Sequence, residues 1–274
     1  MLPQLLKIGP FTLYSFGLMV VVGFALGVSL ASRLAKQRGQ DGEAFLDGAV
    51  VILFASIVGA RLLFVMLNTG QYAQHLLEIG ALWRGGMSFH GGAVAGILAG
   101  WIFMRRKKLP ALPLADAAAP GLALGYAVGR IGCFLNGCCY GGPTSLPWGI
   151  HFPGTEAGVH YHPAQIYATL INLALCGGLV ASYRRPHRSG QILALYIGAY
   201  SVYRFLIEII RKGVTADVAA FGLTGAQLFS IACVIAAGAW WLWLQKNGSP
   251  APALVTNEPA TEGRAESQPE LSAR

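Results

Sequence analysis

Three arginines, Arg61, Arg130 and Arg204, each interrupt an apolar stretch of about twenty residues, roughly the length that crosses a bilayer as a helix. A charge at the centre of a bilayer costs ~2.5–3.5 kcal/mol on insertion scales, so charges at that depth usually serve a function. A guanidinium presents a planar fork of donors that suits phosphate oxygens. The three arginines therefore indicate that a polyanion, such as a lipid phosphate, binds at membrane depth.

The overall composition is that of a membrane protein. Of the 274 residues, 54% are apolar and only 12% are charged, whereas about 25% are charged in a soluble domain. We therefore expect an all-α, polytopic integral membrane protein. The net charge of +8 does not indicate nucleic-acid binding, because most Lys and Arg lie in short loops, where they set the topology.

Apolar runs predict seven transmembrane helices within one domain that covers residues 1–246. The expected spans are residues 14–32, 49–67, 86–104, 114–136, 163–182, 190–210 and 221–244. The first run lacks a cleavage-site pattern, so we expect a retained helix rather than a signal peptide. Residues 247–274 are rich in Pro, Ala, Ser, Glu and Thr, a composition that predicts a disordered tail.

The basic residues outside these spans predict the orientation of the chain. Thirteen Lys and Arg fall on one side of the membrane and four, namely Lys7, Arg84, Arg211 and Lys212, fall on the other. Cytoplasmic loops are enriched in Lys and Arg, so we expect the N-terminus outside and the tail in the cytoplasm. The loop 137–162 contains neither residue, as expected of an exported segment.

On this topology the polar residues of the spans gather in one layer. The three arginines each lie about six residues from the outer end of their spans, which is ~9 Å at 1.5 Å per residue. Glu208 follows Arg204 by one helical turn and shares its face. The remaining members lie at the outer ends of helices: Tyr14, His90, His162 and Gln165. We expect a site that faces the outer leaflet and has excess positive charge.

Each residue also has a structural interpretation. Arg61 alone is equally consistent with a side chain that extends to the lipid headgroups without binding a substrate. His90 alone is consistent with a residue that only packs against its neighbours. Arg204 and Glu208 neutralise each other when they pair. Three arginines with one carboxylate at one depth still leave positive charge, which favours a bound anion. Small residues repeat every fourth position where helices are expected to pack closely: Gly23 and Gly27, then Gly92, Gly96 and Gly100.

The order and spacing of these residues resemble the bacterial prolipoprotein diacylglyceryl transferase family over nearly the whole chain before the tail. The shared positions are 8–10, 17–19, Gly59, Arg61, 86–92, Asp116, 129–132, Phe134, Asn136, Gly137, Gly141, His162, Pro163, Gln165, Tyr167, Arg204, Phe205, Glu208, Arg211 and Gln227. The resemblance implies seven spans with an outside N-terminus in the bacterial plasma (inner) membrane, which agrees with the charge count.

The resemblance also implies an enzyme that catalyses the first step of bacterial lipoprotein maturation. Such enzymes transfer the diacylglyceryl group from phosphatidylglycerol to the lipobox cysteine of a prolipoprotein, so that a thioether forms and glycerol phosphate leaves. The implied partners are phosphatidylglycerol, the lipobox segment and the lipid bilayer. We expect Arg130 and Arg204 to stabilise the departing phosphate, with Arg61 as a weaker third. His90 is expected to accept the thiol proton, because the thiolate is the reactive form.

The remaining expected roles concern orientation and substrate binding. Glu208 is expected to orient Arg204, while Asn136 and Gln165 bind headgroup hydroxyls. The chain departs from the most familiar pattern of the family at four positions, where the family has Tyr, Asn, Glu and an acidic residue: Phe16, Cys133, Cys138 and Ala168. Tyr14 is expected to substitute in part for the missing Tyr. We interpret the chain as a divergent, active member.

The cysteines leave several alternatives open. Cys133, Cys138 and Cys139 lie at the outer end of the fourth span, where an oxidising setting permits a disulfide from Cys133 to either neighbour. A zinc site would want four ligands, and three histidines lie nearby in sequence: His151, His160 and His162. We expect free thiols, no metal and no cofactor. The rival functions are a non-catalytic phospholipid-binding paralogue and a membrane thiol oxidoreductase, although a Cys-x-x-Cys pair is missing.

Overall fold

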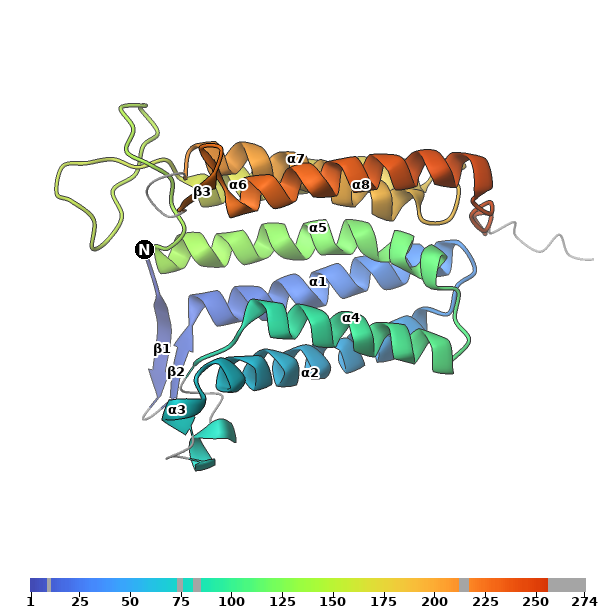
Figure 1. Cartoon of the computed structure of the whole chain (residues 1–274), viewed down its shortest axis with the longest axis horizontal. Coiled ribbons are helices and arrows are strands. Elements are labelled where there is room, and N and C mark those ends of the chain that lie inside the picture. The colour runs from blue at the N-terminus through green and yellow to red at the C-terminus, as the bar shows by residue number, and fades with distance from the viewer. Residues whose placement is uncertain (9–10, 73–75, 81–84, 212–216, 256–274) are drawn as a thin grey trace, which may run out of the picture.

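The computed structural model describes residues 1–8, 11–72, 76–80, 85–211 and 217–255. Long helices dominate this part of the chain and run side by side as a bundle (Figure 1). They are α1 (Ser15–Gln37), α2 (Gly42–Leu67), α4 (Phe89–Arg106), α5 (Ala111–Asn136), α6 (Ala164–Tyr183), α7 (Gln191–Ile209) and α8 (Gly225–Asn247). Two short helices follow α2, namely α3 (Thr69–Tyr72) and the 3₁₀ helix η1 (Leu76–Gly80).

Each long helix overlaps one predicted span, and six of them are long and apolar enough to cross a membrane. An all-α polytopic membrane protein is therefore confirmed. The remaining helix, α4, contains four glycines and ends on Arg105 and Arg106, so its apolar stretch is short. The α2 helix begins seven residues earlier than expected, because the Asp41 carboxylate accepts hydrogen bonds from the amides of Glu43 and Ala44 and caps the helix.

Two small antiparallel hairpins lie at one end of the bundle and were not expected from the sequence (Figure 1). The first pairs β1 (Gln4–Ile8) with β2 (Phe11–Tyr14), and the second pairs β3 (Val218–Ala220) with β4 (Leu223–Thr224). Both hairpins stand directly before a long helix, α1 and α8 respectively. The strands are too short to show a periodic signal in the sequence.

The first residues of the predicted tail, 248–255, lie against the bundle. The α8 helix ends at Asn247, and the segment after it is hydrogen bonded to the bundle. The amide of Ala251 donates to the carbonyl of His187, and the amide of Val255 donates to that of Gln37. The guanidinium of Arg38, only 5% exposed, donates to the carbonyl of Pro252. Backbone hydrogen bonds, rather than apolar burial, hold this segment; residues 256–274 lie outside the described part.

Glycines let the backbones of neighbouring helices touch. A Cβ atom added at Gly27 on α1 would lie 2.6 Å from the carbonyl oxygen of Gly121 on α5. One added at Gly91 on α4 would lie 2.3 Å from the carbonyl oxygen of Gly59 on α2. The close packing predicted from the glycine spacing is confirmed for Gly27, and also for Gly96, where an added Cβ would lie 2.3 Å from the Oγ of Ser56 on α2. Many large apolar side chains remain exposed, for example Phe54 at 64% and Ile97 at 73%, as expected of surfaces that face lipid.

Candidate active site

Arg130 lies half-buried near the end of α5 and is held by a tyrosine of its own helix. It donates a hydrogen bond to the hydroxyl of Tyr126, one turn earlier, and its guanidinium carbon lies 4.7 Å from the centre of that ring. The Tyr126 hydroxyl lies 3.3 Å from the hydroxyl of Tyr203 on α7. Because Tyr203 directly precedes Arg204, this tyrosine pair links the helices that carry the two arginines.

Arg204 is held by a buried carboxylate. Glu208, 2% exposed, forms an ion pair with Arg204 one turn away, and its carboxylate also lies 3.7 Å from Arg211. Its second oxygen accepts a hydrogen bond of 3.1 Å from the hydroxyl of Thr224, which with Gln227 forms the capping box of α8. One carboxylate thus pairs with two guanidiniums, which leaves one positive charge in excess among these three groups. Through Thr224 the same carboxylate also links α7 to α8.

Arg61 is buried, 5% exposed, near the end of α2. Its Nε donates to the carbonyl of Ile79 at 2.8 Å, and Nη1 donates to those of Gly85 at 2.6 Å and Gly86 at 3.0 Å. Its Nη2 donates to the carbonyl of Glu78. All three nitrogens therefore contact backbone oxygens of residues that lie between α2 and α4.

His90 and Tyr14 lie at the same end of the bundle but are exposed. His90 is the second residue of α4 and packs edge-on against Phe89, with ring centres 5.8 Å apart. Tyr14 is the N-cap residue of α1 and is 51% exposed. Within the described residues, no polar contact joins either side chain to Arg130 or Arg204. Their location at this end agrees with the predicted layer, while their roles remain predictions.

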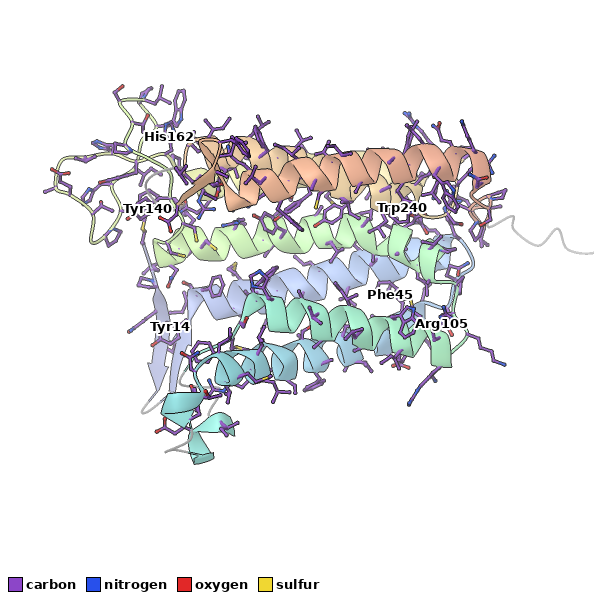
Figure 2. The ribbon with its side chains drawn as sticks, viewed as in Figure 1. Tyr14, Phe45, Arg105, Tyr140, His162 and Trp240 are labelled. Carbon is purple, nitrogen blue, oxygen red and sulfur yellow. The ribbon has the colours of Figure 1, made fainter. Side chains whose placement is uncertain are left out.

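The segment between α5 and α6 extends beyond the ends of the helices, and Tyr140 and His162 lie where it leaves and rejoins the bundle (Figure 2). Gln165, fully buried at the start of α6, donates from Nε2 to the carbonyl of Cys138 at 2.6 Å. Its Oε1 has no hydrogen-bond partner among the described residues. Asn136 ends α5, and its side chain lies against the thiol of Cys138. The two predicted headgroup ligands therefore flank the same residue.

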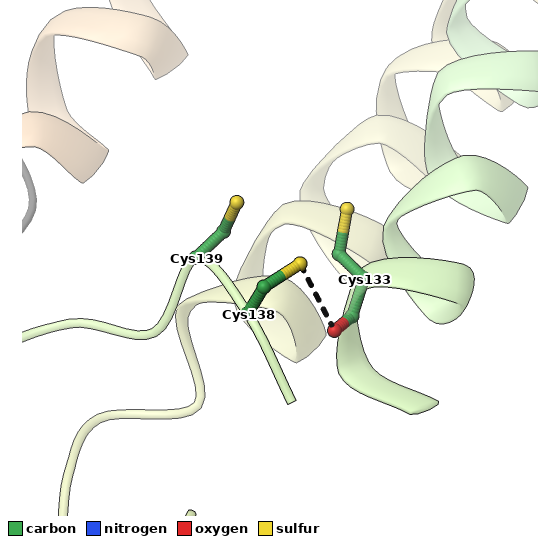
Figure 3. Close-up of side chains that lie close together, drawn as sticks. All are labelled: Cys133, Cys138 and Cys139. Carbon is green, nitrogen blue, oxygen red and sulfur yellow. Dashed lines mark hydrogen bonds between the residues drawn. The ribbon is translucent and has the colours of Figure 1, made fainter. Parts of the chain in front are cut away.

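Three cysteines at the end of α5 and just after it converge. The Sγ atoms of Cys133, Cys138 and Cys139 lie within 4.8 Å of one another, and all three thiols are free and half-buried (Figure 3). The thiol of Cys138 contacts the carbonyl oxygen of Cys133 at 3.7 Å. A hydrogen bond with the Cys133 thiol lowers the pKa of Cys139, whereas burial raises the pKa of Cys138. The three thiols are free, as expected, and the structure brings together the cysteines that the sequence places at one helix end.

An apolar cavity of about 790 Å³ opens between the helix pairs α1–α5 and α2–α4. Its lining includes Gly27, Ala49, Ile97, Leu122, Tyr126 and Gly129. Tyr126 both lines the cavity and accepts a hydrogen bond from Arg130, so the guanidinium lies one side chain away from the apolar space. An amphipathic molecule with an anionic head and apolar chains fits this combination.

Sequence reasoning missed the residues that hold the arginines, namely Tyr126, Tyr203 and Thr224. The sequence contains a signal for Tyr126 and for Thr224. Tyr126 stands four residues before Arg130, a spacing that places two side chains on one helix face. Thr224 and Gln227 form a Thr-x-x-Gln pattern, which is typical of a helix N-terminus. The contact between Tyr126 and Tyr203 crosses from α5 to α7 and has no local signal.

Comparison with known proteins identifies similar chains. The family model for prolipoprotein diacylglyceryl transferase matches residues 3–243. A phosphatidylglycerol–prolipoprotein diacylglyceryl transferase from Gloeobacter violaceus is 37% identical over 262 residues, which cover 91% of this chain and 96% of the relative. One of the same name from Synechococcus elongatus is 34% identical over 278 residues, with 97% and 94% covered. Another, from Bordetella avium, is 37% identical over 216 residues, with 77% and 81% covered.

Proposed function

The chain belongs to the prolipoprotein diacylglyceryl transferase family, and from that premise we propose how its residues carry out the reaction. It is a transferase of lipoprotein biosynthesis that moves the diacylglyceryl group of phosphatidylglycerol to a prolipoprotein cysteine. The sulfur attacks a glyceryl carbon, the carbon–oxygen bond to phosphate breaks, and its electron pair leaves with glycerol phosphate. The site must therefore hold two acyl chains, stabilise a developing phosphate charge and remove a thiol proton.

The observation that carries the proposal is the meeting of the apolar cavity and Arg130 at Tyr126. Acyl chains occupy the cavity between α1, α2, α4 and α5, and the phosphate lies against the guanidinium of Arg130. Arg204 supplies the second guanidinium, because Tyr126 and Tyr203 hold the two helices together. Positioned donors of this kind are worth about 3–4 kcal/mol each in other enzymes.

The remaining residues have distinct roles in this proposal. Glu208 orients Arg204, and His90 accepts the thiol proton. Arg61 acts as a positioning residue, since its nitrogens donate to backbone carbonyls. The unpartnered Oε1 of Gln165 accepts a headgroup hydroxyl. The side chains assigned to bind the substrate beside it are Asn136 and Tyr14.

We also propose the membrane arrangement. All seven long helices, α4 included, span the bacterial plasma (inner) membrane as one domain over residues 1–246. The N-terminus lies outside and residues 247–274 lie in the cytoplasm, in keeping with thirteen against four Lys and Arg on the two sides. The active site then faces the outer leaflet, where exported prolipoproteins arrive.

A mass-shift assay tests the function. Purified protein is incubated with phosphatidylglycerol vesicles and a lipobox peptide that has a single cysteine. We expect a diacylglyceryl mass on the cysteine, about 10²–10³-fold slower with Arg130→Ala, from the loss of one positioned donor. The matched control is Arg105→Ala at the opposite end of the bundle (Figure 2), which should keep full activity.

Two results would contradict the proposal. A folded protein that binds phosphatidylglycerol without any mass shift would be a lipid-binding paralogue. Full activity of a correctly inserted Arg130→Ala variant would refute the phosphate clamp while leaving the transferase in place.

A further inference from the structure

The three-cysteine cluster has no role in the mechanism described above. We propose that Cys133, Cys138 and Cys139 bind one zinc ion, whose fourth coordination position takes the thiol of the prolipoprotein cysteine. This inference rests on the proposed function, because it assigns to the same site a device that activates the nucleophile. It replaces the sequence-based expectation that the site holds no metal.

The distances suit a zinc ion. Zinc binds thiolate sulfur at about 2.3 Å with tetrahedral geometry, so two sulfur ligands of one ion lie ~3.8 Å apart. The three Sγ atoms already lie within 4.8 Å of one another without a metal. Small rotations of the side chains close this gap, and Figure 3 shows the three thiols close together and pointing in roughly the same direction.

The backbone is arranged to bring these thiols together. Gly137 adopts a left-handed conformation (φ 74°) that ends α5, and the amide of Cys138 then donates to the carbonyl of Cys133 at 3.1 Å. Cys139 is also left-handed, with φ 64°, a conformation that residues with a side chain rarely adopt. Consecutive residues of an extended chain point to opposite sides, so this turn is what places the two adjacent thiols on one side.

A buried side chain supports the same turn. Gln165 on α6 donates to the carbonyl of Cys138 at 2.6 Å, which fixes the peptide between Cys138 and Cys139. The cluster is therefore held from two helices, α5 and α6. Strain that the surroundings maintain in this way is typical of binding and catalytic sites.

The three cysteines leave one coordination position of a tetrahedral zinc ion open, and the substrate thiol needs this position. Among the described residues, no fourth His, Cys, Asp or Glu joins the three thiols. Structural zinc sites are closed by four protein ligands, whereas catalytic sites use three and leave a position open. The cysteines are only half-buried, so a peptide thiol can reach this position.

The charges and the location also fit. Zinc with three thiolates has a net charge of −1. The positive charges of Arg130 and Arg211 both favour the thiolate form of Cys139. Cys133 follows Arg130 by three residues, a spacing at which Cβ atoms lie about 5–6 Å apart on a helix. A thiol bound to this zinc therefore lies beside the phosphate held by Arg130.

The resulting step is balanced without a redox change. A thiol that coordinates zinc loses its proton, which His90 accepts in the proposed site. The zinc-bound sulfur then forms the bond to the glyceryl carbon while the carbon–oxygen bond breaks. Its electron pair leaves on glycerol phosphate, which takes the proton. The thioether product binds zinc weakly and leaves, and the ion stays on the three cysteines.

Cobalt(II) substitution tests the site independently of activity. The purified full chain, reduced and then freed of metal, is titrated with Co²⁺ and followed by absorption. We expect one equivalent, with thiolate-to-cobalt charge-transfer bands and the intense visible bands of a tetrahedral ion. Addition of the lipobox peptide should strengthen the charge transfer, because a fourth thiolate binds. A peptide with Ser in place of Cys should leave the spectrum unchanged.

Matched variants locate the ligands. Cys139→Ser should abolish stoichiometric cobalt binding, whereas Cys233→Ser, on α8 away from the cluster, should not change it. Absence of cobalt bands in the folded wild-type chain would by itself overturn the proposal. So would a Cys133 disulfide with Cys138 or Cys139 in protein isolated under thiol-blocking conditions.

Activity separates this inference from the proposed function. We expect removal of zinc to slow the transfer at least tenfold near neutral pH and restoration of one equivalent to recover it. The rate of the metal-loaded enzyme should not increase as the pH is raised toward about 8.5, the ordinary pKa of a thiol. The zinc-bound thiol has already lost its proton at lower pH. Full activity without metal would refute the zinc site and leave the transferase intact. Cobalt and peptide binding without any transfer would refute the proposed function instead.

Discussion

The hydroxyl groups of Tyr126 and Tyr203 lie 3.3 Å apart and join α5 to α7. This contact matters because each tyrosine stands beside one of the two arginines assigned to the phosphate. Tyr126 binds the guanidinium of Arg130 through its hydroxyl and ring, and Tyr203 precedes Arg204. The relative position of the two guanidiniums therefore depends on this tyrosine pair.

Removing the hydroxyl of Tyr126 tests this relationship. Tyr126→Phe keeps the ring but removes the oxygen that accepts from Arg130. A hydrogen bond to a charged group is worth about 1.5–3 kcal/mol, so we expect kcat/KM to fall about ten- to a hundredfold in the mass-shift assay. Tyr196→Phe, a loss of the same group elsewhere on α7, serves as the control. Equal activities of the two variants would show that Tyr126 does not position Arg130.

Glu208 should be essential for stability as well as for orientation. Glu208→Gln removes the carboxylate charge shared by Arg204 and Arg211. Removing one partner of a buried ion pair costs about 3–5 kcal/mol, so we expect a clearly lower unfolding midpoint in detergent. Glu43→Gln, at an exposed position in the first turn of α2, should unfold like the wild-type protein. An unchanged midpoint for Glu208→Gln would contradict the assignment.

The positioning role of Arg61 can be separated from phosphate binding. Arg61→Lys keeps the charge but cannot donate in several directions to the carbonyls of Ile79, Gly85 and Gly86. We expect faster amide hydrogen exchange at Gly86 and Ser88, even when phosphatidylglycerol is saturating. If Arg61 instead binds phosphate, the exchange pattern stays unchanged and only KM for phosphatidylglycerol rises.

His187 predicts a pH dependence of stability at the opposite end of the bundle. Burial lowers the pKa of His187 below its ordinary value of 6.5, and the groups that face it are Asp116, 3.7 Å away, and Arg38. The unfolded chain then binds more protons than the folded chain as pH falls below 6.5. Stability should therefore be complete above pH 6.5 and decline below it. His187→Gln should flatten this decline in the unfolding midpoint, and an equally steep decline would refute the assignment.

A pair of glycine substitutions tests the close packing of α1 against α5. A Cβ at Gly27 would lie 2.6 Å from the carbonyl oxygen of Gly121, whereas one at Gly177 on α6 meets no atom within 4 Å. We expect Gly27→Ala to destabilise the protein by about 1–3 kcal/mol through forced backbone shifts. Gly177→Ala should instead stabilise it by up to about 1 kcal/mol, because alanine favours helix. Similar unfolding midpoints for both variants would show that α1 and α5 can move apart at Gly27 without loss of stability.

Much of the architecture follows from local properties of the chain. Apolar runs of bilayer length predicted each long helix, and the glycine spacing predicted close packing of α1 and α4, while the structure identifies α5 and α2 as their partners. The hairpins before α1 and α8 escaped prediction, since their strands are short. The docking of residues 248–255 also escaped, because it depends on carbonyl groups such as that of His187, which the fold supplies from elsewhere.

The amino-acid sequence by itself determined the membrane class, the helices, the family and the end of the bundle at which the polar residues gather. These properties depend on hydropathy and on spacing within one helix, which neighbouring residues carry. The tertiary structure alone decided that Arg61 donates to backbone carbonyls, that Tyr126 and Tyr203 connect two arginines, and that three thiols converge. Each of these contacts joins separate elements or depends on an unusual backbone turn, so its geometry exists only after the helices have packed.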